Sequence, residues 1–89
     1  MDIISKAIQF AVGAYNGERR KGDGKPLILH AMETAAIVAS LNGEDDTIAA
    51  AILHDTVEDA DISLDNIEAK FGGRVAELVA AETENKRRD

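Results

Sequence analysis

A run of small apolar residues near the middle of the chain restricts the possible folds most strongly. Residues 48–53 read Ile-Ala-Ala-Ala-Ile-Leu, and the polar segment Asp45-Asp46-Thr47 precedes them. Asp and Thr are typical of helix caps and first turns, so we predict a helix from Thr47 to about Asp59. Three consecutive alanines let neighbouring helices approach closely on several sides. We therefore expect this helix to be the buried centre of an all-α domain.

Apolar residues elsewhere recur at intervals of three and four, which predicts four more helices. The first begins after an N-cap at Asp2, and the second comes after a polar loop in which Pro26 disfavours helix at the preceding residue. Ser63 caps the fourth helix, and Gly72-Gly73 separates it from the fifth. No sustained strand-like alternation is present. With the central helix included, the expected ranges are about 3–15, 30–41, 47–59, 64–71 and from 74 onward.

Composition limits the size and chemistry of the domain. The chain has 89 residues, enough for one domain, and its 3% aromatic content leaves Ala, Ile, Leu and Val to build the core. There is no cysteine, which excludes disulfides and thiolate metal sites. The N-terminus lacks a signal peptide or membrane-spanning pattern, so a cytoplasmic location is expected. The net charge of −7 argues against nucleic acid as the main partner.

Two histidines and one aspartate are candidate metal ligands. His54-Asp55 directly follows the apolar run, and His30 lies at the expected start of the second helix. These residues could meet where the two helices touch. Imidazole and carboxylate ligands together suit Mn, Fe, Co, Ni or Zn. The alternative is that His54 is a core histidine hydrogen-bonded to a backbone carbonyl.

Two further carboxylates lie beside this candidate site. Glu58 and Asp59 follow His54 and Asp55 at a spacing of four, so on one continuous helix all four would share a face. Next to a metal, such a carboxylate can act as a general base or position water. The alternative is a solvated helix C-terminus, where negative charge is unfavourable because it opposes the helix dipole.

A basic loop stands out from the acidic remainder of the chain. Arg19, Arg20, Lys21 and Lys25 fall within seven residues that also contain two glycines. Such a loop suits a small anionic ligand, and an arginine can also stack on a base. The alternative is a solvated loop without a ligand, because no glycine-rich phosphate motif is present.

These segments, in this order, resemble the HD-type hydrolase domain of the RelA/SpoT family, including its small stand-alone members that hydrolyse the alarmone (p)ppGpp. Residues 20–30 (RKGDGKPLILH) resemble an Arg-Lys, glycine-containing loop before a Pro-Tyr-Ile-x-His segment. Residues 47–59 (TIAAAILHDTVED) resemble the segment around the family's His-Asp pair, and residues 62–67 and 71–72 resemble the family's next segments. The similarity runs from about Phe10 to Val79, which is about the first half of the family's domain.

The resemblance implies a helical bundle of about five helices that usually binds Mn²⁺, or another divalent transition metal. His30, His54 and Asp55 fall on metal ligands of the family, and Glu58 with Asp59 on its catalytic acidic pair. Arg20 falls on the residue that stacks on guanine, and Lys21 lies beside it near phosphate. The implied reaction is attack of water that releases pyrophosphate from the ribose 3′ position of guanosine-3′,5′-bis(diphosphate).

The chain departs from the family pattern at several points. Tyr15 replaces a histidine, while Leu27 and Ala31 replace a tyrosine and a proline on either side of His30. The family's fourth metal ligand belongs to a later helix that residues 1–89 do not include. We therefore expect a partial HD domain, incomplete at its C-terminus, that binds metal weakly and is inactive by itself.

Three alternatives remain at this point. The first is an HD phosphohydrolase that acts on another nucleotide, and the second is a non-catalytic helical module that binds a nucleotide or a protein. The third concerns assembly: apolar surface left exposed by missing helices would favour a homo-oligomer.

Overall fold

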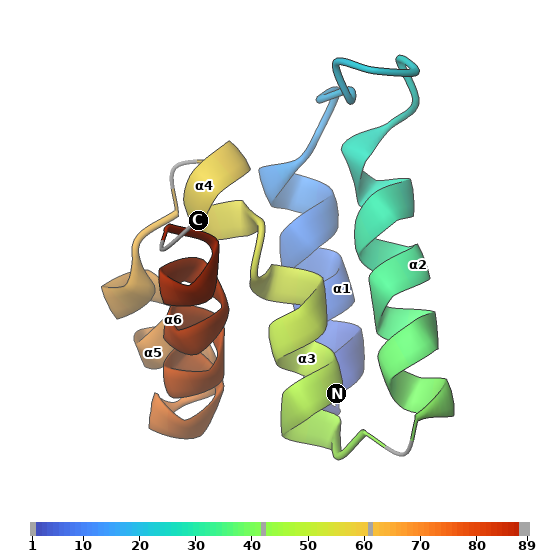
Figure 1. Cartoon of the computed structure of the whole chain (residues 1–89). Coiled ribbons are helices and arrows are strands. Elements are labelled where there is room, and N and C mark those ends of the chain that lie inside the picture. Colours follow the sequence, from blue (N-terminus) through green and yellow to red (C-terminus); the bar gives the residue numbers. More distant parts are fainter. Residues whose placement is uncertain (1, 42, 61, 88–89) are drawn as a thin grey trace.

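The computed structural model consists of helices joined by short connections (Figure 1). It describes residues 2–41, 43–60 and 62–87, without the side chains of residues 58, 59 and 83–87. Six helices lie in these ranges, and α4 is a single turn. They are α1 (Ile3–Ala14), α2 (Leu27–Ser40), α3 (Asp45–Leu53), α4 (Thr56–Asp59), α5 (Leu64–Phe71) and α6 (Gly73–Arg87). The predicted all-α bundle of about five helices is thereby confirmed.

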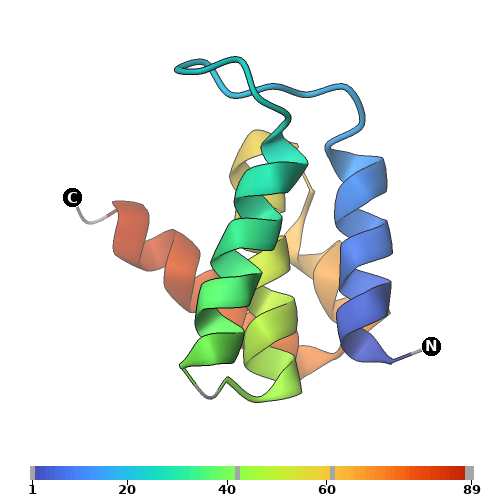
Figure 2. The same ribbon diagram turned by 90° about the vertical axis from the view of Figure 1, so that its right-hand side faces the viewer.

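Helix α3 forms the centre of the domain, as the alanine run predicts. Every residue from Ala49 to Leu53 is buried. The helix packs against α1 and α2 on one side and α6 on the other, and α5 packs on α6 (Figures 1 and 2). Alanine side chains permit this close approach, so the run of small residues determines how tightly the surrounding helices pack.

Local sequence signals account for several helix boundaries. Asp2 Oδ1 accepts a hydrogen bond from the backbone N–H of Ser5 at 2.8 Å. Hydrogen bonding to Ser5 lowers the pKa of the Asp2 carboxyl below its usual value of 3.8. Ser63 Oγ likewise accepts the N–H of Asn66 at 3.1 Å at the start of α5. Gly72 ends α5 with φ +95°, a conformation that costs glycine little. The caps predicted at Asp2 and Ser63 are confirmed.

Two predicted helix ranges are wrong. Helix α2 begins at Leu27 rather than near His30, because Pro26 occupies the N-cap position with φ −55° and helix follows it directly. The helix predicted from Thr47 to Asp59 begins at Asp45 and is interrupted at His54-Asp55. Helix α6 begins at Gly73 and continues through the polar residues after Ala81 to Arg87, in agreement with a helix predicted from about residue 74 onward.

A cluster of two lysines and two phenylalanines joins α1 to α5. The rings of Phe10 and Phe71 are perpendicular, with centroids 5.5 Å apart. Lys6 Nζ lies 5.4 Å from the Phe71 centroid and donates a hydrogen bond to the carbonyl of Lys70 at 2.6 Å, near the end of α5. A cation at a helix C-terminus and over a ring face is favourable on both counts. Lys6 thus fastens the end of α5 to α1.

We expect the substitution Lys6→Met to lower the free energy of unfolding by about 1 kcal/mol, because it keeps the apolar stem but removes the ammonium group. Lys70→Met is the comparison, since Lys70 Nζ lies 5.9 Å from the Phe10 centroid. Its effect should be roughly half as large, because it removes only the weaker ring contact. Urea denaturation followed by circular dichroism measures both; equal effects would show that the hydrogen bond to Lys70 adds nothing.

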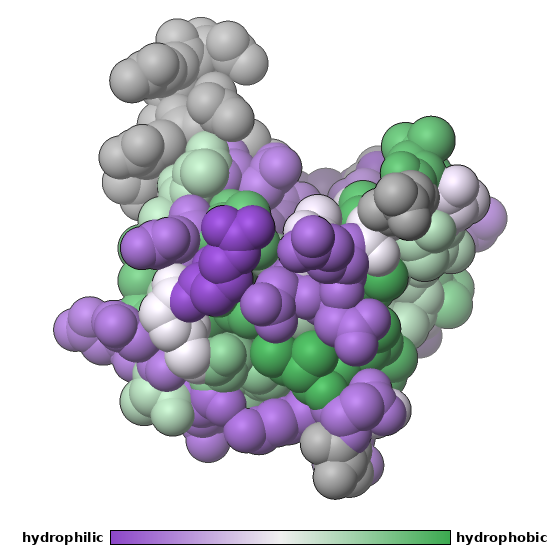
Figure 3. All heavy atoms as spheres, turned by 90° about the horizontal axis from the view of Figure 1, so that it is seen from below, coloured by the Kyte–Doolittle hydropathy of each residue, from purple (hydrophilic) through white to green (hydrophobic). Residues whose placement is uncertain are grey.

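The surface is mixed in character. Viewed from the end opposite the loop between α1 and α2, polar side chains alternate with apolar patches (Figure 3). The most exposed large apolar side chains are Val12, Leu29, Ile37 and Leu41. Within the described part of the chain, no helix is both long and apolar enough to span a membrane.

Candidate metal centre and basic loop

The two histidines and Asp55 come together at one end of the bundle. His30 lies in the first turn of α2, and His54-Asp55 forms the turn between α3 and α4. Because α2 packs along α3, these two segments are neighbours. Figures 1 and 2 both show the loop before α2 and the single turn of α4 at this same end. All candidate groups for binding a metal or an anion therefore lie at one end of the domain.

The two imidazoles contact opposite oxygens of one carboxylate. Nε2 of His30 lies 3.4 Å from Oδ2 of Asp55, and Nε2 of His54 lies 3.1 Å from Oδ1. The side chains of His54 and Asp55 are nearly buried, at 11% and 10% exposure, whereas that of His30 is 38% exposed. The centre is therefore covered on the α3 side and accessible on the side of His30.

The tautomer of His54 is fixed by the backbone of α3. Nδ1 of His54 lies 2.7 Å from the carbonyl oxygen of Ala51. A carbonyl can only accept, so Nδ1 carries the proton and Nε2 of the neutral ring presents a lone pair. That lone pair faces a carboxylate oxygen of Asp55 at 3.1 Å. A proton shared by the two groups, or a metal cation bound by both, would satisfy this arrangement.

Each distance between two of these groups can be compared with the separation expected for two ligands of one metal ion. Two ligands each about 2.1 Å from a metal lie about 3.0 Å apart at a right angle and about 3.4 Å apart at a tetrahedral angle. The observed separations of 3.1 and 3.4 Å fall at these values. A histidine whose other nitrogen bonds a backbone carbonyl is also a common arrangement in metal sites. The donor set and the pair distances fit a divalent transition metal.

The set is not complete in the described residues. No three His, Asp or Glu side chains there surround a common position that could hold a metal as they stand. The two distances end on different oxygens of Asp55, so the fit rests on the donor chemistry of two imidazoles and a carboxylate that lie side by side. The side chains of Glu58 and Asp59 lie outside the described residues, so their predicted catalytic role stays a prediction. The backbone of both residues belongs to α4, and the helix break removes the continuous face on which their alignment with His54 and Asp55 depended.

The basic loop is a closed hairpin held by its own hydrogen bonds. Arg19 pairs with Pro26 in an isolated antiparallel bridge, and Arg20 N–H donates to the carbonyl of Lys25 at 2.8 Å. The guanidinium of Arg19 crosses the loop and donates to the carbonyl of Gly24 at 2.9 Å. Residues 16–25 are all exposed, as expected for a solvated loop. Their backbone is nevertheless ordered by the hydrogen bonds within the hairpin.

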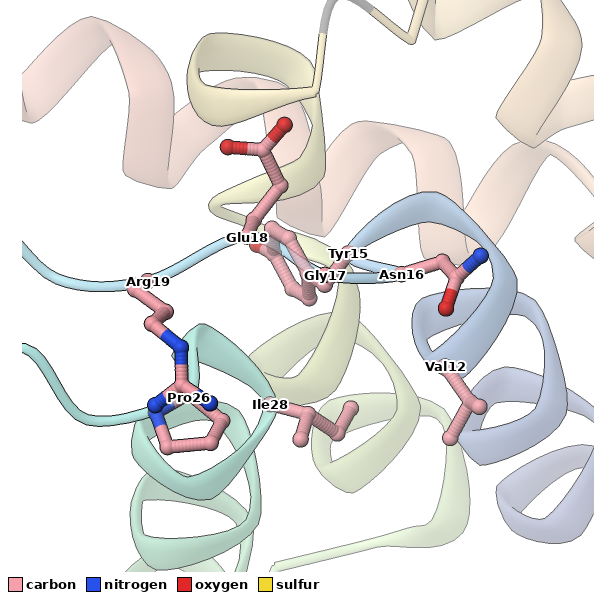
Figure 4. A pocket seen from close by; sticks show the side chains of 8 residues that line it. All are labelled: Val12, Tyr15, Asn16, Gly17, Glu18, Arg19, Pro26 and Ile28. Atoms are coloured by element: carbon pink, nitrogen blue, oxygen red, sulfur yellow. The ribbon is translucent and has the colours of Figure 1, made fainter.

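Two pockets flank this hairpin. One has a volume of about 470 Å³ and is lined by Glu18, Arg19, Arg20, Lys21, Gly22 and Leu27. The other, about 250 Å³, lies between the end of α1 and the start of α2 (Figure 4). In Figure 4 the side chains of Glu18 and Arg19 point in opposite directions from the loop, with Arg19 directed to the side of Pro26. The larger pocket contains both predicted substrate residues, Arg20 and Lys21.

The larger pocket and the candidate metal centre both include a residue of the first turn of α2. Leu27 lines the pocket and lies three residues before His30, which places the two residues on the same face of the helix. A ligand that reached from Arg20 and Lys21 to His30 would pass along this face of α2. This arrangement could take an anionic molecule with one end on the loop and the other near the metal ligands.

Two side-chain hydrogen bonds that matter for this geometry were not predicted from the sequence. The Arg19 side chain closes the hairpin. The Thr56 hydroxyl donates a hydrogen bond to the carbonyl of Leu53, at the end of α3, at 2.6 Å. Both side chains bond backbone carbonyls three to five residues away. Such contacts depend on the fold of a turn, which no spacing of residue types in this sequence indicates.

Replacing Arg19 by Met is expected to loosen the hairpin. Loss of one charged hydrogen bond of about 1 kcal/mol should raise the population of open loop, and hence the rate of tryptic cleavage after Arg20 and Lys21, about fivefold. Mass spectrometry of the early fragments measures this rate at each bond. Lys25→Met is the control, because it removes a loop charge without removing the Arg19–Gly24 hydrogen bond. An equal increase in both variants would contradict the role of Arg19.

Comparisons with known proteins agree with this architecture. A match to the HD domain family extends over residues 7–89. The chain is 41% identical over 80 residues to a guanosine-3′,5′-bis(diphosphate) 3′-pyrophosphohydrolase of Aquifex aeolicus, covering 90% of this chain and 11% of that protein. It is 43% identical over 81 residues to a probable enzyme of the same name from Synechocystis sp., covering 91% and 10%.

A solved structure gives the same result in three dimensions. A metazoan ortholog of SpoT, described as hydrolysing ppGpp and acting in starvation responses, superposes with a TM-score of 0.82 at 29% identity. The superposition covers 90% of this chain and 47% of that one. The predicted resemblance is confirmed, and the chain spans about a tenth of the length of these curated relatives.

Proposed function

Because the chain belongs to the HD-domain family, we propose that it is a metal-dependent phosphohydrolase whose substrate is a guanine nucleotide with a 3′ pyrophosphate group. The observation that carries the proposal is the meeting of two imidazole nitrogens on opposite oxygens of the buried Asp55 carboxylate. The names of its relatives point to guanosine-3′,5′-bis(diphosphate) as the first substrate to test. From the sequence we expect that the metal is Mn²⁺ and that the protein is located in the cytoplasm.

His30, His54 and Asp55 would hold the metal. A divalent metal lowers the pKa of bound water and stabilises negative charge on phosphate oxygens. Asp55 lies between the two histidines and contributes the negative charge that a cation needs. The Ala51 carbonyl orients His54, so its Nε2 is directed to this centre before any ligand arrives.

The basic loop would hold the nucleotide. Arg20 stacks on the guanine and Lys21 neutralises phosphate charge, while the closed hairpin keeps both residues in place before binding. A loop ordered in advance loses less conformational entropy on binding, which favours affinity. Glu58 or Asp59 accepts a proton from the attacking water.

The reaction exchanges one phosphorus–oxygen bond for another. The water oxygen bonds to the phosphorus attached at the ribose 3′ oxygen, and the bond from that phosphorus to the 3′ oxygen breaks. The products are pyrophosphate and guanosine 5′-diphosphate, whose 3′ oxygen takes up a proton.

Ion-exchange chromatography of the reaction products tests the proposal directly. The intact protein, rather than residues 1–89 alone, is incubated with guanosine-3′,5′-bis(diphosphate) and Mn²⁺, and pyrophosphate release is expected to stop on addition of EDTA and to resume when Mn²⁺ is restored. A chain that binds Mn²⁺ and the nucleotide without releasing pyrophosphate would support the non-catalytic binding module instead. Failure to bind either would refute the proposed function.

A different nucleotide substrate is the second candidate. Leu27, which lines the pocket beside Arg20 and Lys21, replaces the tyrosine expected from the family pattern and so removes one aromatic ring and hydroxyl. A panel of guanine and adenine nucleotides with and without 3′ phosphates separates the two candidates. Selectivity for guanine that is lost in Arg20→Ala favours the first.

A further inference from the structure

Two side chains form hydrogen bonds with backbone carbonyls at the C-terminal end of α3. The last four carbonyls of a helix have no partner within the helix. Here Nδ1 of His54 bonds the carbonyl of Ala51, and the hydroxyl of Thr56 donates to the carbonyl of Leu53 at 2.6 Å. Thr56 is fully buried. One of the two side chains that cap α3 is thus a candidate metal ligand, and the other lies one residue after Asp55.

Thr56 also holds the far side of the same turn. Its carbonyl oxygen accepts the backbone N–H groups of Ala60 and Ile62, each at 3.1 Å. The hydroxyl therefore connects Thr56 back to α3, and its carbonyl connects it forward to the segment after α4. His54-Asp55 lies between α3 and this residue, so its backbone is fixed at both ends.

We propose that Thr56 is a positioning residue of the metal centre: its hydroxyl bond to Leu53 sets the backbone of the turn, and so aims Asp55 at His30 and Nε2 of His54. The part of this inference that concerns metal binding rests on the proposed function. The part that concerns the backbone of the turn rests on the hydrogen bonds alone. Without the hydroxyl, the Leu53 carbonyl loses a buried partner and the residues after it are held less firmly. His54 and Asp55 have helical dihedrals (φ −58°, ψ −36° and φ −82°, ψ −11°), so small changes in these angles are enough to alter the directions of both side chains.

Three variants test this role. Thr56→Val removes the hydroxyl at nearly constant shape, and Thr56→Ser restores it without the methyl group. Ser40→Ala is the matched control, because Ser40 Oγ donates to the carbonyl of Ile37 at 2.7 Å with the same three-residue spacing, at the opposite end of α2 from His30. All measurements are made at a temperature where circular dichroism shows each variant to be folded.

The first measurement is Mn²⁺ affinity by isothermal titration calorimetry. Thr56→Val should bind about tenfold more weakly, and Thr56→Ser within about twofold of the parent chain, as for other residues that orient metal ligands. Ser40→Ala should match the parent. A purely stabilising role for Thr56 would lower the melting temperature and leave the affinity of the folded protein unchanged, and that result would overturn the inference.

The second measurement needs no metal. In the metal-free chain, Thr56→Val should speed hydrogen exchange of the His54 amide, which donates to the carbonyl of Ala50 at 2.8 Å, and raise the Nε2–H tautomer of His54 in ¹⁵N spectra. Thr56→Ser should reverse both changes. Unchanged exchange and tautomer in Thr56→Val would overturn the inference even if the parent chain bound no metal, a result that would count against the proposed function alone.

Discussion

Replacing Asp55 by Asn is expected to weaken Mn²⁺ binding by at least about 100-fold and to abolish metal-dependent pyrophosphate release by the intact protein, because loss of an outer partner alone costs about 10- to 100-fold. The amide keeps the size of the side chain but removes its negative charge, and it turns one oxygen acceptor into a donor. Both acceptor oxygens matter here, since each faces a different imidazole. Calorimetric titration with Mn²⁺ measures the loss.

Asp65→Asn is the control for this experiment. Asp65 is exposed in the first turn of α5, so the variant has the same change in net charge at a position away from the candidate metal centre. Its affinity for Mn²⁺ should equal that of the parent chain. If Asp55→Asn binds the metal as tightly as Asp65→Asn does, the carboxylate of Asp55 is not a ligand, and the geometric argument for the metal centre fails.

The largest effect on stability is expected from Ile52→Ala. Ile52 is fully buried in α3, where its side chain fills space among the surrounding helices. Its truncation should lower the free energy of unfolding by about 2–5 kcal/mol, and Ile52→Val by about 0.5–1.5 kcal/mol. A domain has only about 5–15 kcal/mol in total, so the Ala variant is expected to be marginally folded.

Ile37→Ala separates burial from residue type. Ile37 belongs to α2 and is 54% exposed, so the same truncation should cost about 0.5 kcal/mol or less. Urea denaturation of the three variants gives the comparison. A cost at Ile37 as large as that at Ile52 would mean that the exposed face of α2 is covered in solution, as in the homo-oligomer considered from the sequence.

The helices and the central position of α3 could be predicted because each depends on local patterns. Apolar residues at helical spacing, Asp2 and Ser63 as caps, and Gly72 as a stop all act within a few residues. Burial of the three alanines follows from their size. These signals involve only adjacent residues, so no knowledge of distant contacts is required to use them.

The break at His54-Asp55 could not be predicted in this way. No glycine or proline lies between Thr47 and Asp59, and the residues there are compatible with continuous helix. In this turn, the side chains of His54 and Thr56 bond carbonyls at the end of α3, and such bonds form only in the folded arrangement. The same holds for the hairpin closed by Arg19. The residue types of the candidate metal centre could be identified from the sequence, whereas the orientations of their side chains could not.

The helix break has a consequence for how this fold tolerates changes in length. One residue inserted into α3 would rotate everything after it by about 100°, which would turn His54 and Asp55 away from His30 although all three residues would still be present. An insertion at the exposed tip of the hairpin, at residues 21–23, would displace neither α2 nor α3. Designers who wish to graft new binding specificity onto this scaffold should therefore vary the hairpin tip and keep the register between Asp45 and Asp55 unchanged.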